Sequence, residues 1–203
     1  MGHRLMLVLS PATIVLTLVL AGSSFLGHSN PGSSAAVVNV CWARGYGSLK
    51  ELVASPYTTV IVKGVVIEAK SYVEGLHEPT RGPGLIFTDY LLEVQLVLKG
   101  SLNVSDVITI HQTGGTIGEA VMTVWDDPPL SVGDALILFL YEYEPGKYYI
   151  EGGPQGRFIL RDGLVYSLGE IHEPAEAVTR PFKIHGQSEL QFIHSIESAL
   201  KQG

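Results

Sequence analysis

The stretch that decides the fold is Ala135-Leu-Ile-Leu-Phe-Leu-Tyr141, the most apolar run of the chain outside its first 26 residues. Its length suits a β-strand, and because no polar residue interrupts it, both of its faces must be covered. We therefore expect a core strand whose alternate leucines are buried on one side. Ile137 and Phe139 should be buried on the other side, against a second element.

Further β patterns lie on both sides of this run. Residues 58–69 are rich in Val and Ile on both faces, and every second residue from Leu92 to Leu98 is apolar, which predicts a strand with one buried face. Shorter strands are expected at 107–112, 120–125, 147–151, 156–161 and 164–167. Several short strands separated by turn residues predict a mostly β domain, built as a small closed or partly open barrel.

Two short helices are expected at the ends of the β region. Ser48-Leu-Lys-Glu51 has capping-box spacing, which predicts a helix from Ser48 to about residue 54, ended by Pro56. Ser188-Glu-Leu-Gln191 repeats the pattern at the start of a C-terminal helix. The apolar stripe of that helix consists of Leu190, Ile193, Ile196 and Leu200. Such a stripe should pack against the barrel, over Ile137 and Phe139.

The N-terminus carries an export signal. Residues 5–26 have no charged side chain and follow Arg4, and a helix over them would be about 33 Å long, enough to cross the hydrocarbon core of a bilayer. Small residues at 21–23 and 34–36 suit cleavage, so a cleaved signal peptide and an uncleaved membrane anchor both stay open. In both cases the domain is extracytoplasmic, either secreted or tethered to the membrane by residues 5–26.

The predicted organisation has five parts. They are a signal peptide or signal anchor at 1–26, a flexible stalk at 27–40, a β-barrel domain at 41–168, a linker at 169–187 and a helix packed on the barrel at 188–203. The stalk is assigned because its residues are small, polar and turn-forming.

Charge and cysteine content exclude some classes of protein. The chain has 13 Lys and Arg against 20 Asp and Glu, a formal net charge of -7, and its sequence has no basic cluster. Because a basic patch is needed to neutralise phosphates, we expect no nucleic-acid partner. Cys41 is the single cysteine, so an internal disulfide is excluded and the fold must rest on packing.

Four glycine-containing motifs follow one another in a characteristic order. They are Val97-Leu-Lys-Gly100, Gly114-Gly115, Gly133-Asp-Ala-Leu-Ile-Leu-Phe-Leu140 and Gly152-Gly-Pro-Gln-Gly-Arg-Phe158. Over roughly residues 48–168, this order after a long first strand resembles a group of uncharacterised exported bacterial and archaeal β-barrel proteins. More distantly it resembles the netrin-like and tissue-inhibitor-of-metalloproteinase barrels, which have an OB-type fold.

The resemblance implies an OB-like or netrin-like barrel fold, but it does not assign the activity of those families to this chain. Metalloproteinase inhibitors bind the protease zinc through a cysteine at the mature N-terminus. Here Cys41 follows Val40, with Val38 two residues earlier, and these residues do not suit a cleavage site that would make Cys41 the N-terminus.

The candidate ligand surface consists of Tyr141, Tyr143, Tyr148 and Tyr149, which flank one predicted hairpin. Tyrosine side chains on a barrel surface stack on sugars or peptides, and they are also favoured cross-strand partners, so both interpretations stay open. His77-Glu78 and His172-Glu173 lack the closely spaced second histidine typical of zinc sites. We predict no metal, no cofactor and no catalytic residue.

The leading hypothesis is a non-catalytic extracytoplasmic module that binds a protein, peptide or glycan, or helps to build the cell envelope. The alternative is an extracellular enzyme or a protease-inhibitor-like protein. An enzyme should bring polar side chains together in a deep pocket, whereas a binding module should show a shallow face with exposed aromatic residues. The membrane is a partner through residues 5–26 if that segment is not cleaved.

Overall fold

The computed structural model describes residues 6–7, 15–17, 35–38, 40–41, 44–74, 84–168, 184 and 186–202. The chain divides into two compact units. Unit 1 comprises Met1–Ala43, Ser71–Thr88 and Thr113–Pro129, and unit 2 comprises Arg44–Lys70, Asp89–Gln112 and Leu130–Gly203.

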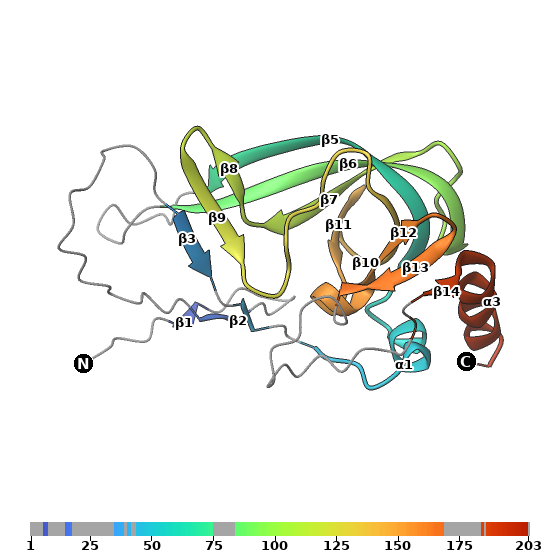
Figure 1. The fold of residues 1–203 in the computed structure, drawn as a ribbon. Coiled ribbons are helices and arrows are strands. Elements are labelled where there is room, and N and C mark those ends of the chain that lie inside the picture. The colour runs from blue at the N-terminus through green and yellow to red at the C-terminus, as the bar shows by residue number, and fades with distance from the viewer. Residues whose placement is uncertain are drawn as a thin grey trace. The chain divides into compact units, whose positions relative to one another are not determined.

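The main sheet of the protein is built from strands of unit 2. These are β5 (Val60–Glu74), β6 (Leu85–Lys99), β7 (Val107–Thr113), β10 (Ala135–Glu144), β11 (Lys147–Ile150), β12 (Arg157–Arg161), β13 (Leu164–Ser167) and β14 (Gln187–Ser188). The ends of three of these strands, residues 71–74, 85–88 and 113, belong to unit 1. The strand order is β11-β7-β6-β5-β10-β12-β13-β14, and β11 also pairs with β10 (Figure 1). That last pairing closes five strands into a ring, so the expectation of a mostly β domain is confirmed.

Strand β10 is central to this sheet, as its composition predicts. One of its edges pairs with β5 along Ala135–Leu140, while the other pairs first with β12, from Leu136, and then with β11, from Leu140. All of these pairings are antiparallel, whereas β11 and β7 are parallel. Both edges of β10 are therefore occupied by other strands.

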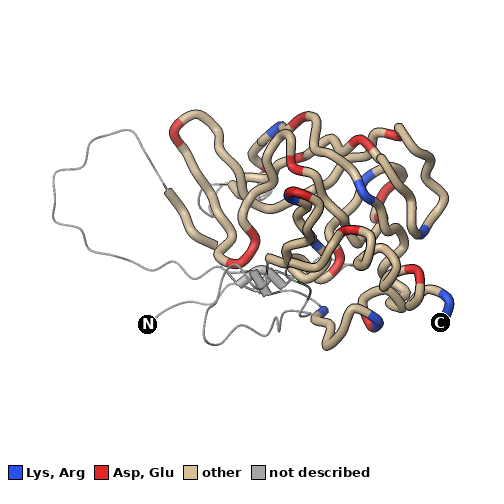
Figure 2. Tube along the Cα trace, turned by 45° about the vertical axis from the view of Figure 1, so that its right-hand side comes forward, with Lys and Arg blue, Asp and Glu red and all other residues tan. Residues whose placement is uncertain are grey.

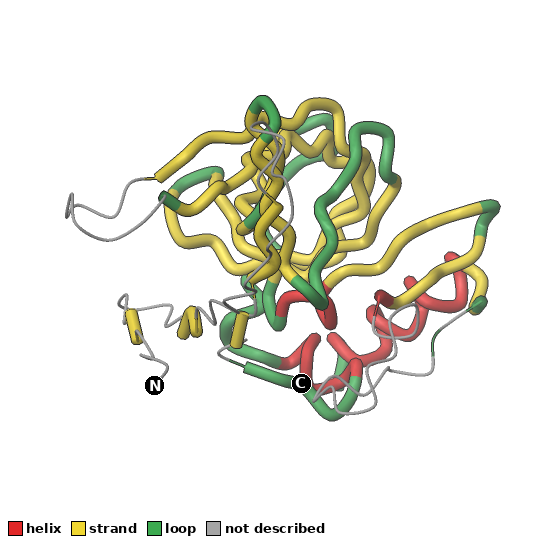
Figure 3. The backbone as a smooth tube through the Cα atoms, turned by 60° about the vertical axis from the view of Figure 1, so that its left-hand side comes forward, coloured by secondary structure: helices red, strands yellow, loops and turns green. Residues whose placement is uncertain are grey.

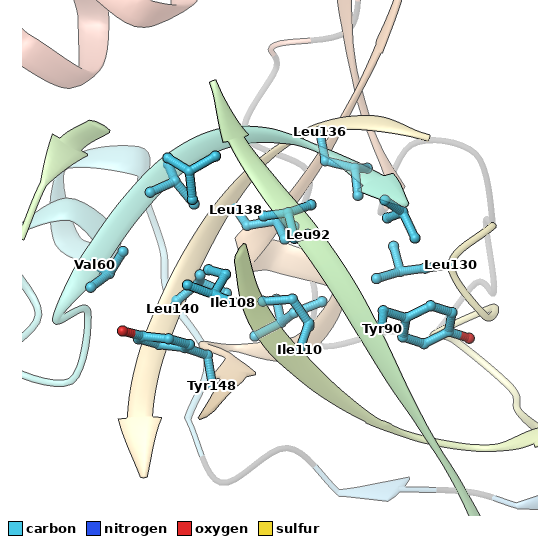
Figure 4. Close-up of a cluster of buried hydrophobic side chains, with 14 of the residues drawn as sticks. Val60, Tyr90, Leu92, Ile108, Ile110, Leu130, Leu136, Leu138, Leu140 and Tyr148 are labelled. Carbon is cyan, nitrogen blue, oxygen red and sulfur yellow. The ribbon is translucent and has the colours of Figure 1, made fainter. Parts of the chain in front are cut away.

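The interior of the ring is the larger hydrophobic cluster, shown in Figure 4. Leu136, Leu138 and Leu140 are all fully buried in it, as predicted for the alternate leucines of β10. The predicted alternation of β6 is correct at Leu92 and Val94 but not beyond. Val97 packs against the interior, and Leu98 packs against the cluster on the other face of β10. The strict period of two expected for 92–98 is therefore interrupted after Val94.

The other face of β10 packs against two helices, α1 (Leu49–Ala54) and α3 (Glu189–Leu200), which contact each other (Figure 3). Ile137 and Phe139 are fully buried in this second cluster together with Phe192 and Ile196. The rings of Phe139, Phe158 and Phe192 form a chain, with centroid distances of 5.6 Å and 4.6 Å. The predicted packing of the C-terminal helix on the core strand is confirmed.

The predicted stripe of α3 needs one correction. Leu190 is 80% exposed, and Phe192 is buried in its place. Leu190 follows Glu189, whose carboxylate binds Lys63 Nζ at 2.6 Å beside the first turn of the helix. Ile193, Ile196 and Leu200 belong to the buried side, as expected.

Both helices begin at the predicted serines. Ser48 Oγ accepts a hydrogen bond from Glu51 N at 3.2 Å, and Ser188 Oγ accepts one from Gln191 N at 3.3 Å. The Glu51 carboxylate accepts from the backbone of Gly47 at 2.8 Å, one residue before the position that a capping box requires.

Unit 1 contains two small sheets. One has the order β3-β9-β8, with β3 (Ala35–Val38), β8 (Gly115–Ile117) and β9 (Ala120–Val124), and the other joins β1 (Met6–Leu7), β2 (Val15–Thr17) and β4 (Val40–Cys41). The strand predicted at 120–125 therefore lies in a separate sheet and not in the ring. Its parallel partner, β3, lies within the segment predicted as a stalk.

Several predictions fall largely outside the described residues. Of residues 5–26 the structure describes only β1 and β2, so a helix over that segment stays a prediction. Among the described residues there is no helix long and apolar enough to span a membrane. His77, His172 and most of the linker at 169–187 also lie outside the described residues.

Candidate functional site

The four predicted tyrosines lie on the hairpin of β10 and β11, but not on one face. Tyr141 is the register partner of Tyr149, and Glu142 is that of Tyr148. Tyr148 points into the ring and is 2% exposed, with its hydroxyl donating to Glu142 Oε1 at 3.2 Å. Because neighbouring residues of a strand face opposite ways, Tyr149 is directed outward. Tyr148 is thus a core residue and does not belong to the ligand surface.

The third tyrosine, Tyr143, lies at a β-bulge on the same side of β10 as Tyr141. The register of β10 and β11 shifts between Glu142 and Glu144, which places the bulge at Tyr143. Its ring lies 4.2 Å from that of Tyr149, with an interplanar angle of 33°. Two tyrosine rings therefore lie against each other outside the ring of strands.

A histidine and a carboxylate lie beneath these two tyrosines. His111 of β7 is only 7% exposed although it points away from the core, and its ring is 5.2 Å from Tyr149 and 6.2 Å from Tyr143. Its Nδ1 lies 2.7 Å from Asp89 Oδ1 of β6. The contact with the carboxylate favours a proton on Nδ1 and fixes the orientation of the imidazole.

Tyr141 connects this group to a second one. Its ring meets that of Tyr57 edge-on at a centroid distance of 6.1 Å. The guanidinium of Arg44 lies 3.6 Å above the Tyr57 ring, which is a cation–π arrangement. Tyr57 is 40% exposed, so its ring is accessible from solvent.

Arg44 is held by a buried acid. Glu151, directly after β11, is 3% exposed and accepts from Arg44 Nε at 2.7 Å and from Nη2 at 3.2 Å. Tyr46 also donates its hydroxyl to Glu151, and that hydroxyl lies 2.9 Å from Ser55 Oγ. The hydrogen bond to Glu151 raises the pKa of Arg44 above its ordinary value. Gly152, at φ +68°, leaves room for the Tyr46 ring, because a Cβ there would lie 3.0 Å from Cε2.

Together these contacts define an aromatic row on the outside of unit 2. The aromatic row consists of Tyr57, Tyr141, Tyr149, Tyr143 and His111. Tyr141, Tyr143 and Tyr149 are half-buried, so each is supported by its neighbours while part of its surface stays accessible. Four of the five residues lie on strands of the ring, β7, β10 and β11, and Tyr57 lies in the turn that follows α1.

The charged groups around the row are arranged in pairs. Lys147 Nζ lies 2.8 Å from Glu144 Oε2, and this contact raises the pKa of Lys147, with a smaller contribution from Asp89. Arg44 pairs with Glu151 and His111 with Asp89, as described above. Figure 2 shows basic and acidic positions of unit 2 scattered among uncharged residues. The charges of Arg44 and Lys147 are thus each compensated by a neighbouring carboxylate.

Sequence reasoning identified three of the five rings and missed the other two. His111 falls at an outward position of the predicted strand 107–112, so the alternation of that strand could have indicated it. Tyr57 follows a helix-ending proline and shows no periodic signal. Its contact with Tyr141 joins residues far apart in the chain, which no local pattern reveals.

No group of three or more His, Cys, Asp or Glu side chains suitable for a metal ion occurs among the residues that the structure describes. A scan against protein-family models finds no match for this chain. A search of curated protein sequences likewise finds no similar protein. The candidate site therefore has to be interpreted from its geometry alone.

Two tyrosine hydroxyls should make the fold sensitive to alkaline pH. Burial and then the hydrogen bond to Glu151 raise the pKa of Tyr46 from 10.0 to about 12, and burial and the Glu142 charge do the same for Tyr148. A pKa that is higher in the folded state stabilises the protein fully below pH 10, and this stabilisation is lost as the pH rises towards 12. The denaturant midpoint, measured across that interval beside tyrosinate absorbance, should fall steadily.

The matched variant for this experiment is Tyr46→Phe, which removes one of the two titrating hydroxyls. Its midpoint should fall less steeply with pH than that of the unaltered chain. A midpoint that stays constant over the interval in the unaltered chain would show that neither phenol titrates with folding.

Proposed function

We propose that this chain is a non-catalytic, extracytoplasmic binding module whose ligand docks on the aromatic row. The observation that carries the proposal is the group of four partly accessible tyrosine rings on the outside of the sheet, three of them from the β10–β11 hairpin, with His111 beneath two of them. Exposed aromatic groups of this kind are typical of ligand-binding surfaces. The extracytoplasmic location is proposed from the uncharged apolar segment at residues 5–26.

We also propose that the ring of strands is an OB-type barrel. Numbered along the chain from β5, the strands of the ring follow the order 1-2-3-5-4-1, and the third and fifth strands, β7 and β11, are parallel. This order and this parallel pair are those of the five-stranded OB-type barrel. The assignment agrees with the resemblance to netrin-like barrels, and such barrels carry many unrelated activities.

The alternative function, an extracellular enzyme, is favoured by one observation. Asp89 and His111 form a carboxylate–imidazole pair, the arrangement that holds a general base in one tautomer in many hydrolases. However, both Tyr143 and Tyr149 contact the imidazole, and its 7% exposure restricts access to it. The pair therefore supports the tyrosine rings more readily than it serves a reaction.

The test is retention of envelope components by the immobilised full chain. A solubilised envelope extract is passed over the chain, and retained protein and carbohydrate are both quantified. Replacing two stacked rings, Tyr143→Ala with Tyr149→Ala, should reduce retention by about tenfold, since each aromatic contact contributes about 0.5–1.5 kcal/mol.

The matched control is Trp125→Ala, an aromatic side chain that is 64% exposed but lies in unit 1, outside the aromatic row. It should retain as much material as the unaltered chain. Equal retention by the double tyrosine variant would refute the proposed surface. Turnover of ester or glycoside substrates that is lost in His111→Asn would favour the enzyme instead.

A further inference from the structure

The strands that carry the aromatic row leave little backbone for a ligand to pair with. Strand β10 pairs with β5 on one edge and with β12 and β11 on the other, and β11 pairs with β10 and β7. An extended peptide commonly binds by adding a strand to a free sheet edge. The paired stretches of β10 and β11 have no free edge that a peptide strand could use. Along these paired stretches, which on the β5 edge of β10 end at Leu140, recognition must rely on ring faces and side-chain polar groups.

The charges around the row indicate an uncharged ligand. Arg44, Lys147 and His111 each lie within 2.8 Å of a carboxylate oxygen, from Glu151, Glu144 and Asp89 respectively. An anionic ligand would have to compete with these carboxylates, and a cationic ligand would have to compete with the basic partners. Since Glu151 compensates Arg44 and Glu144 compensates Lys147, neither of these two pairs gives a ligand of either sign a net attraction.

The polar groups beside the rings suit hydroxyl groups. The side chain of Asp89 is 34% exposed while it contacts His111, so part of the carboxylate is accessible from solvent next to Tyr149. The half-buried tyrosines add phenolic hydroxyls, each of which both donates and accepts. A ligand with apolar ring faces and many hydroxyls would use both components of this surface.

We propose that the ligand of the aromatic row is a neutral linear oligosaccharide, whose successive sugar rings stack on successive aromatic side chains. The inference rests on the proposed function and specifies the ligand class. The ring centroids of Tyr57 and Tyr141 lie 6.1 Å apart and those of Tyr143 and Tyr149 lie 4.2 Å apart, so one extended chain of sugars along the hairpin can contact the accessible parts of several of them at once. Asp89 and the tyrosine hydroxyls bind sugar hydroxyls at the His111 end of the row.

The test uses isothermal titration calorimetry of the full chain with three kinds of probe. Cellohexaose and maltohexaose are the neutral sugars, an oligogalacturonate of the same length is the anionic sugar, and a capped uncharged peptide of similar length represents the protein ligands. At least one neutral sugar should bind, with an affinity that hardly changes with salt, because no net charge is involved. The oligogalacturonate and the peptide should bind at least tenfold more weakly.

Variants connect the binding to the row. Tyr149→Ala should weaken binding of the neutral sugar by about tenfold, the upper end of what one aromatic contact contributes. Tyr149→Phe keeps the ring and should weaken it less than Tyr149→Ala does. Trp125→Ala should leave the affinity unchanged, and near-ultraviolet circular dichroism checks that each variant is folded.

The possible results distinguish a wrong ligand class from a wrong proposed function. If the peptide or the oligogalacturonate binds best and Tyr149→Ala weakens that binding, the aromatic row is a binding surface but the neutral-sugar assignment is wrong. If none of the probes binds while envelope retention still depends on Tyr143 and Tyr149, the assignment is again wrong. If retention does not depend on the tyrosines either, the proposed function fails with it.

Discussion

Truncation of Phe192 to alanine should lower the free energy of unfolding by about 3–5 kcal/mol, the usual cost of removing a buried phenylalanine from a core. The side chain is fully buried and its ring lies 4.6 Å from that of Phe158, which in turn contacts Phe139 of β10. The variant would leave a cavity beneath α3 at the centre of the second hydrophobic cluster. Urea unfolding followed by circular dichroism measures the loss.

The matched control lies two residues earlier on the same helix. Leu190 is 80% exposed, so Leu190→Ala should change the unfolding free energy by no more than about 0.5 kcal/mol in either direction. Comparison of the two alanine variants thus tests which apolar side chains of α3 are directed towards the ring of strands. A large effect of Leu190→Ala, or a negligible effect of Phe192→Ala, would mean that the helix docks through a different side.

Helical spacing alone could not make this distinction. Residues 190, 193, 196 and 200 form one acceptable stripe, and 192, 196, 199 and 200 form another that overlaps it on the same cylinder. The overlap explains why the buried side of α3 was predicted correctly as a whole. Which residue of the first turn is buried depends on the contacts of that turn, where Glu189 binds Lys63 of β5.

The sequence predicts the centre of the fold better than its periphery. The run at 135–141 has no polar residue, so burial on both faces follows directly, and the structure confirms it at Leu138 and Phe139. The pairing of β9 with β3 brings together residues more than 80 positions apart, Ala35 with Val121. Neither strand shows a pattern that identifies its partner, so the strand at 120–125 could be predicted but its place in a separate sheet could not.

In the candidate site, too, contacts between residues close in the sequence could be predicted, whereas contacts between residues far apart in the sequence could not. The tyrosines of the β10–β11 hairpin are neighbours in the sequence, so their proximity could be predicted. The period of two puts Tyr143 on the same face as Tyr141, but the sequence does not indicate the β-bulge at Tyr143, and Tyr148 turns inward to Glu142. Asp89 and His111 come from different strands, and only the register of β6 and β7 brings them together.

Replacement of Arg44 by methionine should destabilise the protein by about 3 kcal/mol, at the lower end of the cost of leaving a buried charge without its partner. Its partner Glu151 has a side chain that is only 4% exposed, and the guanidinium provides two of its hydrogen bonds. Tyr46 alone would then donate to the carboxylate. The lower end of the range applies because the Arg44 side chain is 27% exposed. Its removal also removes the free-energy cost of partly burying the guanidinium, which offsets part of the loss.

A double-mutant cycle isolates the contribution of the pair. Glu151→Gln removes the acid's charge but keeps its shape, and the double variant removes both charges. We expect the double variant to be more stable than Arg44→Met alone, because no uncompensated carboxylate remains buried. If Arg44→Met and the double variant unfold at the same denaturant concentration, the cost comes from lost packing of the arginine and not from the buried charge.

The same substitution should reach the binding surface through Tyr57. Arg44 lies 3.6 Å above that ring, and the ring meets Tyr141 in the aromatic row. Removal of the guanidinium removes the contact that holds the Tyr57 ring in its orientation, so the neutral sugar should bind more weakly to Arg44→Met even where the variant is fully folded. Glu151→Gln keeps the arginine and should affect sugar binding less. Equal binding by Arg44→Met and the unaltered chain would mean that the row ends at Tyr141 and that the Arg44–Glu151 pair serves stability alone.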